Sequence, residues 1–161
     1  MIKYAKKDNF YSIFPMGKIP NDWEELTKEE YDKHFEKTFD ELKVEKLAEL
    51  TAITSKFDNQ LVNNEMVIKS SLGFSINADL RSQNNLRGLI AVGVEPVNFV
   101  TADNSVQSLT LEQLNVLLNE CALNGQSLYL QKWEYKARIE NAQTKEELEA
   151  IELKFTMRDV S

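Results

Sequence analysis

The sequence has few of the residues that build metal sites, disulfides or phosphate-binding loops: one cysteine, one histidine and five glycines in 161 residues. A single cysteine, Cys121, cannot form an intrachain disulfide, and with His34 it supplies too few ligands for a structural zinc ion. The scattered glycines form no glycine-rich phosphate loop, and no run of 18 apolar residues could span a membrane. We therefore expect no metal, no other cofactor and no membrane association.

Basic residues are also too few to balance the acidic ones, at 19 against 26, so the formal net charge is −7. This balance argues against non-specific binding to nucleic acid. The chain is 42% hydrophobic and 28% charged, as in a globular protein, and its length fits one domain with a small N-terminal appendage. Its N-terminus lacks the continuous apolar core of a signal peptide, so we expect a protein of the reducing cytoplasm.

Residues 1–26 are predicted to form a β-hairpin and a loop. Aromatic and β-branched residues dominate Ile2–Ala5 and Phe10–Phe14, which a polar turn joins. Prolines and a glycine then mark a connecting loop.

Residues 27–63 are predicted to form a long amphipathic helical segment. Thr27 and Glu30 match a capping box, and the segment contains neither glycine nor proline. Apolar residues recur at helical spacing as far as Leu61. The pattern does not decide between one continuous helix and a break near Thr38–Asp40. A narrow apolar stripe needs a partner, either the rest of the chain or another copy of it.

Residues 64–161 are predicted to form a C-terminal α+β domain. A hairpin over Met66–Asn77, with Gly73 at its turn, leads to a helix over Leu80–Val92 that is capped by Asp79. A second strand pair, Val97–Thr101 with Val106–Ser108, leads to a helix from Thr110 to about Asn141. A last helix is predicted over about Lys145–Lys154, starting at a Thr144–Glu147 capping box. The fold class is therefore α+β, helix-rich, with small antiparallel hairpins.

No residue pattern indicates catalysis. His34 lies among Asp32, Glu36 and Lys37, which favours a solvated charged helix face over a general base. Cys121 is in helical register with Leu114, so we interpret it as a small buried hydrophobe and not as a reactive thiol. We accordingly expect a protein that is not an enzyme.

Candidate residues for binding a partner come from exposed-aromatic and helix-start patterns, and each has a structural alternative. For Trp23 and Tyr31 the structural alternative is packing on the N-terminal hairpin. For the polar cluster from Ser82 to Asn85 it is helix capping. We favour the structural alternative in both cases. Trp133 and Tyr135 alternate on the long helix, so one of them should face outward. The full set of candidates is Trp23, Tyr31, Phe35, Ser82, Gln83, Asn85 and Trp133.

Four local patterns in the C-terminal part of the chain occur together. They are the strand-to-helix step from Phe74 to Asp79, the group Ser82-Gln83-Asn85, the turn Asp103-Asn104 and the helix start Leu109-Thr110. Over residues 64–153 the chain thereby resembles a phage domain family of unknown biochemical function. Such domains occur in tail-fibre assembly proteins and other small tail-region proteins of tailed phages and prophages.

A second resemblance covers the N-terminus, through Phe10-Tyr11, Ile19-Pro20-Asn21-Asp22 and the helix start around Thr27. These residues are similar to the opening of tail-fibre assembly chaperones, although the glycine-rich segment that usually follows the helix is absent. The two resemblances imply a factor that binds a phage tail-fibre polypeptide in the host bacterial cytoplasm and assists its folding or trimerisation. The alternative is a structural tail component retained in the virion, which forms homo-oligomers through the 35–61 helix.

Overall fold

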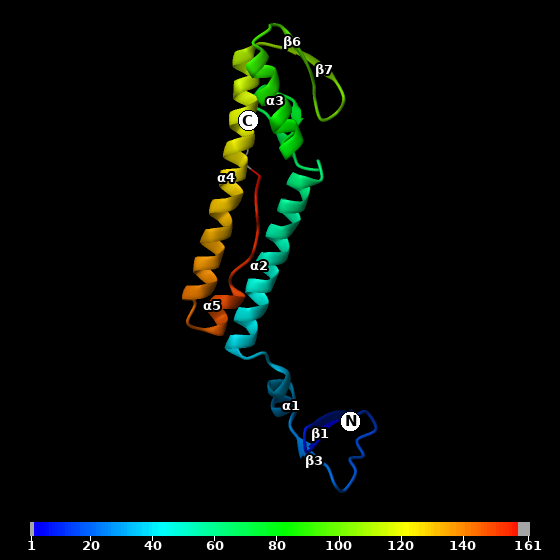
Figure 1. Ribbon diagram of the computed structural model, residues 1–161. Helices are drawn as coiled ribbons and strands as arrows, with labels where there is room; N and C mark the ends of the chain where they lie inside the picture. Colours follow the sequence, from blue (N-terminus) through cyan, green and yellow to red (C-terminus); the bar gives the residue numbers. More distant parts are fainter. Residues whose placement is uncertain (1, 158–161) are drawn as a thin grey trace. The chain divides into compact units, whose positions relative to one another are not determined.

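The computed structural model of the protein describes residues 2–157, in which helices alternate with small antiparallel sheets in an α+β fold (Figure 1). Contacts divide the chain into two compact units, residues 1–41 and 42–161. The boundary falls inside the segment 27–63, which was predicted to be one structural unit. Its first helix contacts the N-terminal sheet, whereas apolar residues of its second helix pack against the core of the C-terminal unit.

The N-terminal unit is built on a three-stranded antiparallel sheet in the order β2-β1-β3. The predicted hairpin is confirmed, with β1 at Lys3–Lys7 and β2 at Phe10–Phe14. The third strand, β3 at Glu24–Leu26, lies where the sequence predicted only a loop. Two lysines of β1 hold β3 in place through ion pairs, Lys3 with Glu25 at 2.8 Å and Lys6 with Glu24 at 3.1 Å.

Two helices replace the long helical segment. Helix α1, Lys28–Phe35, begins at the predicted Thr27 capping box, and α2, Phe39–Val62, follows after a break. A capping box that the sequence analysis did not identify explains the break. The Glu41 amide donates to Thr38 Oγ1 at 3.2 Å, and Glu41 Oε2 accepts from the Thr38 amide at 2.8 Å. The 35–61 segment is therefore not one continuous helix.

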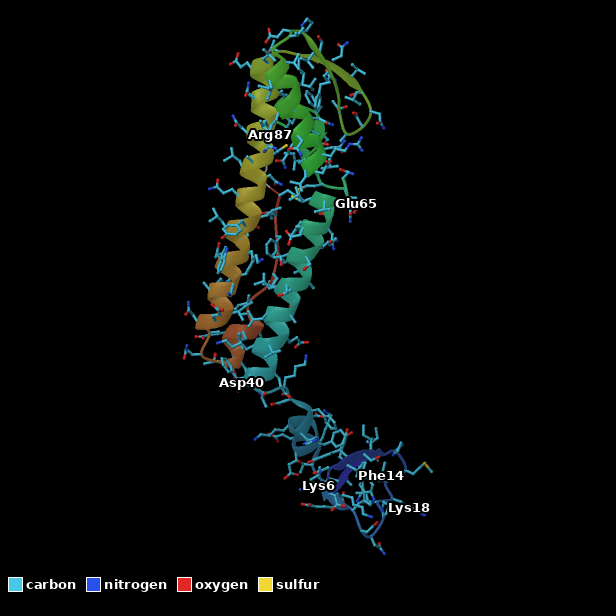
Figure 2. All side chains as sticks on the ribbon, in the orientation of Figure 1. Lys6, Phe14, Lys18, Asp40, Glu65 and Arg87 are labelled. Carbon is cyan, nitrogen blue, oxygen red and sulfur yellow. The ribbon has the colours of Figure 1, made fainter. Side chains whose placement is uncertain are left out.

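The C-terminal unit begins with α2, whose predicted apolar stripe is confirmed. Leu50 is buried, and Phe57 and Leu61 pack against the core. Glu65, labelled in Figure 2, lies in the turn that leads to the hairpin of β4, Val67–Lys69, and β5, Ser75–Asn77. As predicted, Gly73 lies in the hairpin turn, where its φ of 93° suits a residue without a Cβ.

Helix α3 and the second hairpin match the predicted ranges closely. Asp79 caps α3, Leu80–Val92, by accepting from the Ser82 amide at 2.8 Å, and Gly93 closes the helix in the left-handed conformation. The strands β6, Val97–Val100, and β7, Val106–Leu109, follow.

Two more helices complete the unit. Helix α4, Leu111–Asn141, begins at the predicted Thr110–Gln113 capping box. The last helix, α5, begins at Lys145 as predicted, with Thr144 Oγ1 accepting from the Glu147 amide at 3.2 Å. The reciprocal bond of the predicted capping box is not formed, because Glu147 Oε2 accepts from the Gln143 amide. The predicted end near Lys154 is wrong, since α5 spans only Lys145–Glu149. The chain then leaves the helix because Phe155 packs between α2 and α4, a position that a helix continued to Lys154 would not provide.

The core of the C-terminal unit lies where the two hairpins, α3 and the first half of α4 meet. Its buried residues are Met66, Ile68, Ile76, Ala78, Leu86, Leu109, Leu114, Leu117, Cys121 and Leu128.

Candidate functional site

A groove between α2 and α4 contains a cavity of about 350 Å³, within the usual size range of ligand pockets. Its lining comes from facing turns of the two helices, the start of α3 and the C-terminal segment. The lining residues are Thr54, Phe57, Asp58, Leu61, Met66, Leu80, Gln83, Cys121, Ala122, Gly125, Leu128, Tyr129, Lys132 and Phe155. Figure 2 shows side chains of both helices reaching into the space between them.

Part of this groove is occupied by the chain's own C-terminal segment, residues 150–157, which runs without helical structure between α2 and α4 (Figure 1). Two α4 side chains bind its backbone. Tyr135 Oη donates to the Lys154 carbonyl at 2.8 Å and accepts from the Lys154 amide at 3.1 Å. Gln131 binds the amide and the carbonyl of Thr156, each at 2.9 Å. From α2, Lys46 Nζ donates to the Ile151 carbonyl at 2.9 Å.

An exposed aromatic surface borders the cavity on α4. Tyr129 is 59% exposed and Trp133 is 47% exposed, and their ring centroids are 6.0 Å apart. The Lys136 ammonium lies 4.9 Å from the centre of the Trp133 ring, a cation–π contact. Because Tyr129 also lines the cavity, the aromatic surface and the groove are continuous.

The thiol of Cys121 lines the cavity but is poorly suited to act as a nucleophile. Burial raises the pKa of the Cys121 thiol to about 11, and the carboxylates of Glu120 and Asp79 add to this effect. The thiolate is the reactive form of cysteine, so little of it exists at neutral pH. The prediction that Cys121 is a buried hydrophobic residue is confirmed.

The neighbouring Glu120 is a buried carboxylate that ties α4 to the turn between β4 and β5. Its Oε1 accepts from the Ser71 amide at 3.0 Å and from the Ser71 hydroxyl at 2.5 Å. Its Oε2 has no hydrogen-bond partner among residues 2–157. Glu120 does not line the cavity, and its contacts indicate a structural role.

The candidate residues of the sequence analysis are not gathered in one place. Gln83 and Trp133 lie at the groove, Gln83 in its lining and Trp133 beside Tyr129. Ser82 donates to Asp79, and Gln83 Nε2 donates to the Ala78 carbonyl at 2.9 Å, which agrees with their interpretation as capping residues. Asn85 is exposed on α3.

The remaining candidates belong to the N-terminal unit and pack on its sheet. Trp23 meets Phe14 edge to face at 5.5 Å, and the Tyr31 ring lies 5.0 Å from those of Tyr4 and Phe35. Phe35 is still 59% exposed. His34 is exposed, as expected, and its ring stacks on Tyr11 at 3.5 Å.

Several groove residues were not recognised as such from the sequence. Phe57 and Leu61 lie at the helical spacing of the predicted apolar stripe, Leu128 lies within the predicted helix from Thr110 to about Asn141, and Phe155 follows the range predicted for the last helix. The one local indication was Gly125, a helix-breaking residue inside α4 whose missing side chain leaves open space. Among residues 2–157 no group of three or more His, Cys, Asp or Glu is arranged to hold a metal ion. In the same part of the chain, no helix has the length and apolar character needed to cross a membrane.

The fold and the groove define a small α+β domain in which two long helices enclose a non-helical C-terminal segment. The chain belongs to the DUF4376 family, a domain of unknown function, which matches residues 41–152. The family begins earlier than the resemblance noted over residues 64–153 and so includes nearly all of α2. No curated protein and no solved structure matches the chain.

Proposed function

We propose that the protein is a tail-fibre assembly chaperone of a tailed phage or prophage. It acts in the host bacterial cytoplasm, without catalysis, by binding the fibre polypeptide and assisting its folding or trimerisation. The proposal starts from the sequence resemblances at Phe10-Tyr11, Ile19–Asp22 and the Thr27 helix start, together with the phage-like pattern of residues 64–153.

One structural observation supports this proposal most directly: a groove that binds backbone groups of a non-helical segment and continues into an open apolar cavity. A chaperone for a β-rich client must hold extended chain before that chain has found its partners. Backbone hydrogen bonds beside apolar pockets are a general way of binding extended polypeptides.

The alternative, a virion tail component that assembles through residues 35–61, has less support. Phe35 ends α1, and α2 begins only at Phe39. Within α2, Leu50 and Thr54 are already buried in the monomer, so much of the stripe is not available for a coiled coil between copies.

Co-expression tests the proposal. A tail-fibre protein of the same phage or prophage is produced with and without this chain, and soluble trimer is measured by size-exclusion chromatography with light scattering. We expect a clear gain of soluble trimer with the chain present, and an equal yield without it would contradict the proposal. Mass spectrometry of purified particles addresses the alternative, because a chaperone should be absent from them and a tail component should be present in stoichiometric amount.

A further inference from the structure

The two edges of the N-terminal sheet differ in how well they are protected. Strand β3 has only three residues, and Glu24 and Glu25 place charge along its edge. Short length and charge are common ways to keep an edge strand from pairing with another chain. Strand β2, at the other edge, has neither protection. It has five residues, FYSIF, without a charge or a proline, and its continuous register with β1 contains no bulge.

The direction of the backbone groups of β2 follows from this register. Lys7 and Phe10 pair on either side of a two-residue turn, so these two residues exchange backbone hydrogen bonds. Every second residue of β2 from Phe10 onward then directs its N–H and C=O groups towards β1. Tyr11 and Ile13 direct theirs outward, and within residues 2–157 no strand pairs with that side of β2. An added strand would find donors and acceptors at both residues.

The side chains of β2 are largely apolar on both faces of the sheet. Tyr11 and Ile13 lie on the face covered by α1, where the Tyr11 ring stacks on His34. Ile13 is nevertheless 48% exposed, and on the opposite face Phe10 is 71% exposed. Pairing with another strand would bury part of this apolar surface, which is the main favourable term in protein association.

The residues of β2 are arranged so that the strand can pair with a second copy of itself. In an antiparallel pair centred on Ser12, Tyr11 of each copy lies opposite Ile13 of the other, and every outward N–H and C=O group of these residues is used. On the other face of the sheet, Phe10 lies opposite Phe14 of the second copy, with Cβ atoms about 4.5–5.5 Å apart. Both faces thus gain apolar contacts between the strands.

The distribution of charge favours a second copy as the occupant. The charged residues of the sheet lie on β1 and β3, where Lys3 and Lys6 pair with Glu25 and Glu24. Joining two β2 strands places uncharged strands in the centre and the two β3 strands outermost, five strand spacings or about 24 Å apart. The Debye length is about 8–10 Å, so the acidic edges are screened from each other. Pairing through β3 would instead bring the glutamates together.

We propose that the free edge of β2 is a homodimer interface. Two copies of the chain join their N-terminal sheets antiparallel about a two-fold axis at Ser12, and the two three-stranded sheets become one continuous sheet. The inference goes beyond the proposed function and does not depend on it, because it concerns the chain alone and requires no fibre protein.

The two-fold axis allows a test by charge exchange. Ser12 would lie opposite Ser12 of the second copy, so Ser12→Lys and Ser12→Glu each bring like charges together, whereas a 1:1 mixture of the two variants brings opposite charges together. Ser55→Lys is the matched control, since Ser55 is exposed on α2 in the C-terminal unit and the net charge changes equally. Thermal melting followed by circular dichroism checks that all variants are folded.

Sedimentation equilibrium over a range of protein concentrations measures the dissociation constant of the dimer. We expect the unmodified chain and Ser55→Lys to dimerise equally. At low salt Ser12→Lys and Ser12→Glu should each dimerise at least about tenfold more weakly, because like charges opposed across an interface are costly. The 1:1 mixture should recover the dimer, which variants that had merely lost their fold could not do.

The assignment is wrong if the unmodified chain stays monomeric, if Ser12→Lys dimerises as well as Ser55→Lys, or if the mixture does not recover the dimer. A client strand at this edge would give a different result. A monomeric chain whose effect on the fibre is abolished by Ser12→Lys but not by Ser55→Lys would assign the edge to the client and overturn the proposal. Dimerisation restored by charge exchange, with no effect of the chain on the fibre, would leave the interface standing and refute the chaperone.

Discussion

The side-chain amide of Gln131 pairs with both backbone groups of Thr156: Oε1 accepts from the amide nitrogen and Nε2 donates to the carbonyl oxygen, each at 2.9 Å. With Tyr135, it anchors the C-terminal segment in the α2–α4 groove. The anchor is local, so its loss should release residues 150–157 more than it disturbs the core.

Replacing Gln131 by leucine should loosen the segment. The change removes two hydrogen bonds at similar side-chain size, for a loss of about 1–2 kcal/mol in the free energy of unfolding. Hydrogen exchange of the Thr156 amide, measured by NMR, should accelerate more than that of core amides. Gln126→Leu on the exposed side of α4 is the control. Equal exchange at Thr156 in the two variants would contradict the anchoring role.

Replacing glycine by alanine should raise the free energy of unfolding at some positions and lower it at others. Gly88→Ala and Gly125→Ala should each raise the free energy of unfolding by roughly 0.5–1 kcal/mol, because alanine favours helix and nothing obstructs its Cβ. Gly93→Ala should instead lower it, because Gly93 has a φ of 70° at the end of α3. Urea denaturation measures all three variants. Destabilisation by Gly125→Ala would show that the space beside Gly125 is not open.

Stability should fall in alkaline solution through Cys121. The folded-state pKa of about 11 lies above the ordinary value of 9.0, so the unfolded chain loses the thiol proton first as the pH rises. The stabilisation is present below pH 9 and is lost between about pH 9 and 11. The free energy of unfolding is measured for the unmodified chain and for Cys121→Ala, each relative to its own value at pH 7. Over this range the value for the unmodified chain should fall below that of the variant. Identical pH dependence in the two proteins would rule out a contribution of the Cys121 thiol.

Loss of the Thr110–Gln113 capping box at the start of α4 should lower the stability of the protein measurably. Thr110 Oγ1 accepts from the Gln113 amide at 3.2 Å, and Gln113 Oε1 accepts from the Thr110 amide at 2.9 Å. Thr110→Ala should lower the free energy of unfolding by about 1 kcal/mol. In a double-mutant cycle with Gln113→Ala, the two losses should not be additive, because the two hydrogen bonds link the same two residues and fix the same turn of backbone. Strict additivity would mean that the box does not act as a unit.

The parts of the fold that were predictable are those with local chemical causes. The caps at Thr27, Asp79 and Thr110 and the turn at Gly73 were recognised because single side chains determine them. Strand β3 was missed because Glu24 and Glu25 have no strand preference of their own. Their pairing with Lys6 and Lys3 across the sheet stabilises the strand, and this partnership exists only after folding.

The site was less predictable than the fold. Of the predicted candidates, Trp133 and Gln83 lie at the groove. The cavity itself depends on space left unfilled between α2 and α4, which a periodic pattern of residues cannot predict. The end of α5 illustrates the same limit. The sequence favours helix to Lys154, yet tertiary contacts of Ile151 and Phe155 determine the backbone there.

The position of residues 150–157 between α2 and α4 has a consequence for synthesis. The residues that cover Phe57 of α2 include Phe155, which the ribosome adds roughly 5–20 seconds later at ordinary elongation rates. During that interval the apolar face of α2 lacks its final partner, whereas the N-terminal unit finds its contacts within the first 41 residues. The N-terminal unit should thus fold while the chain is still being made, and the groove should form last.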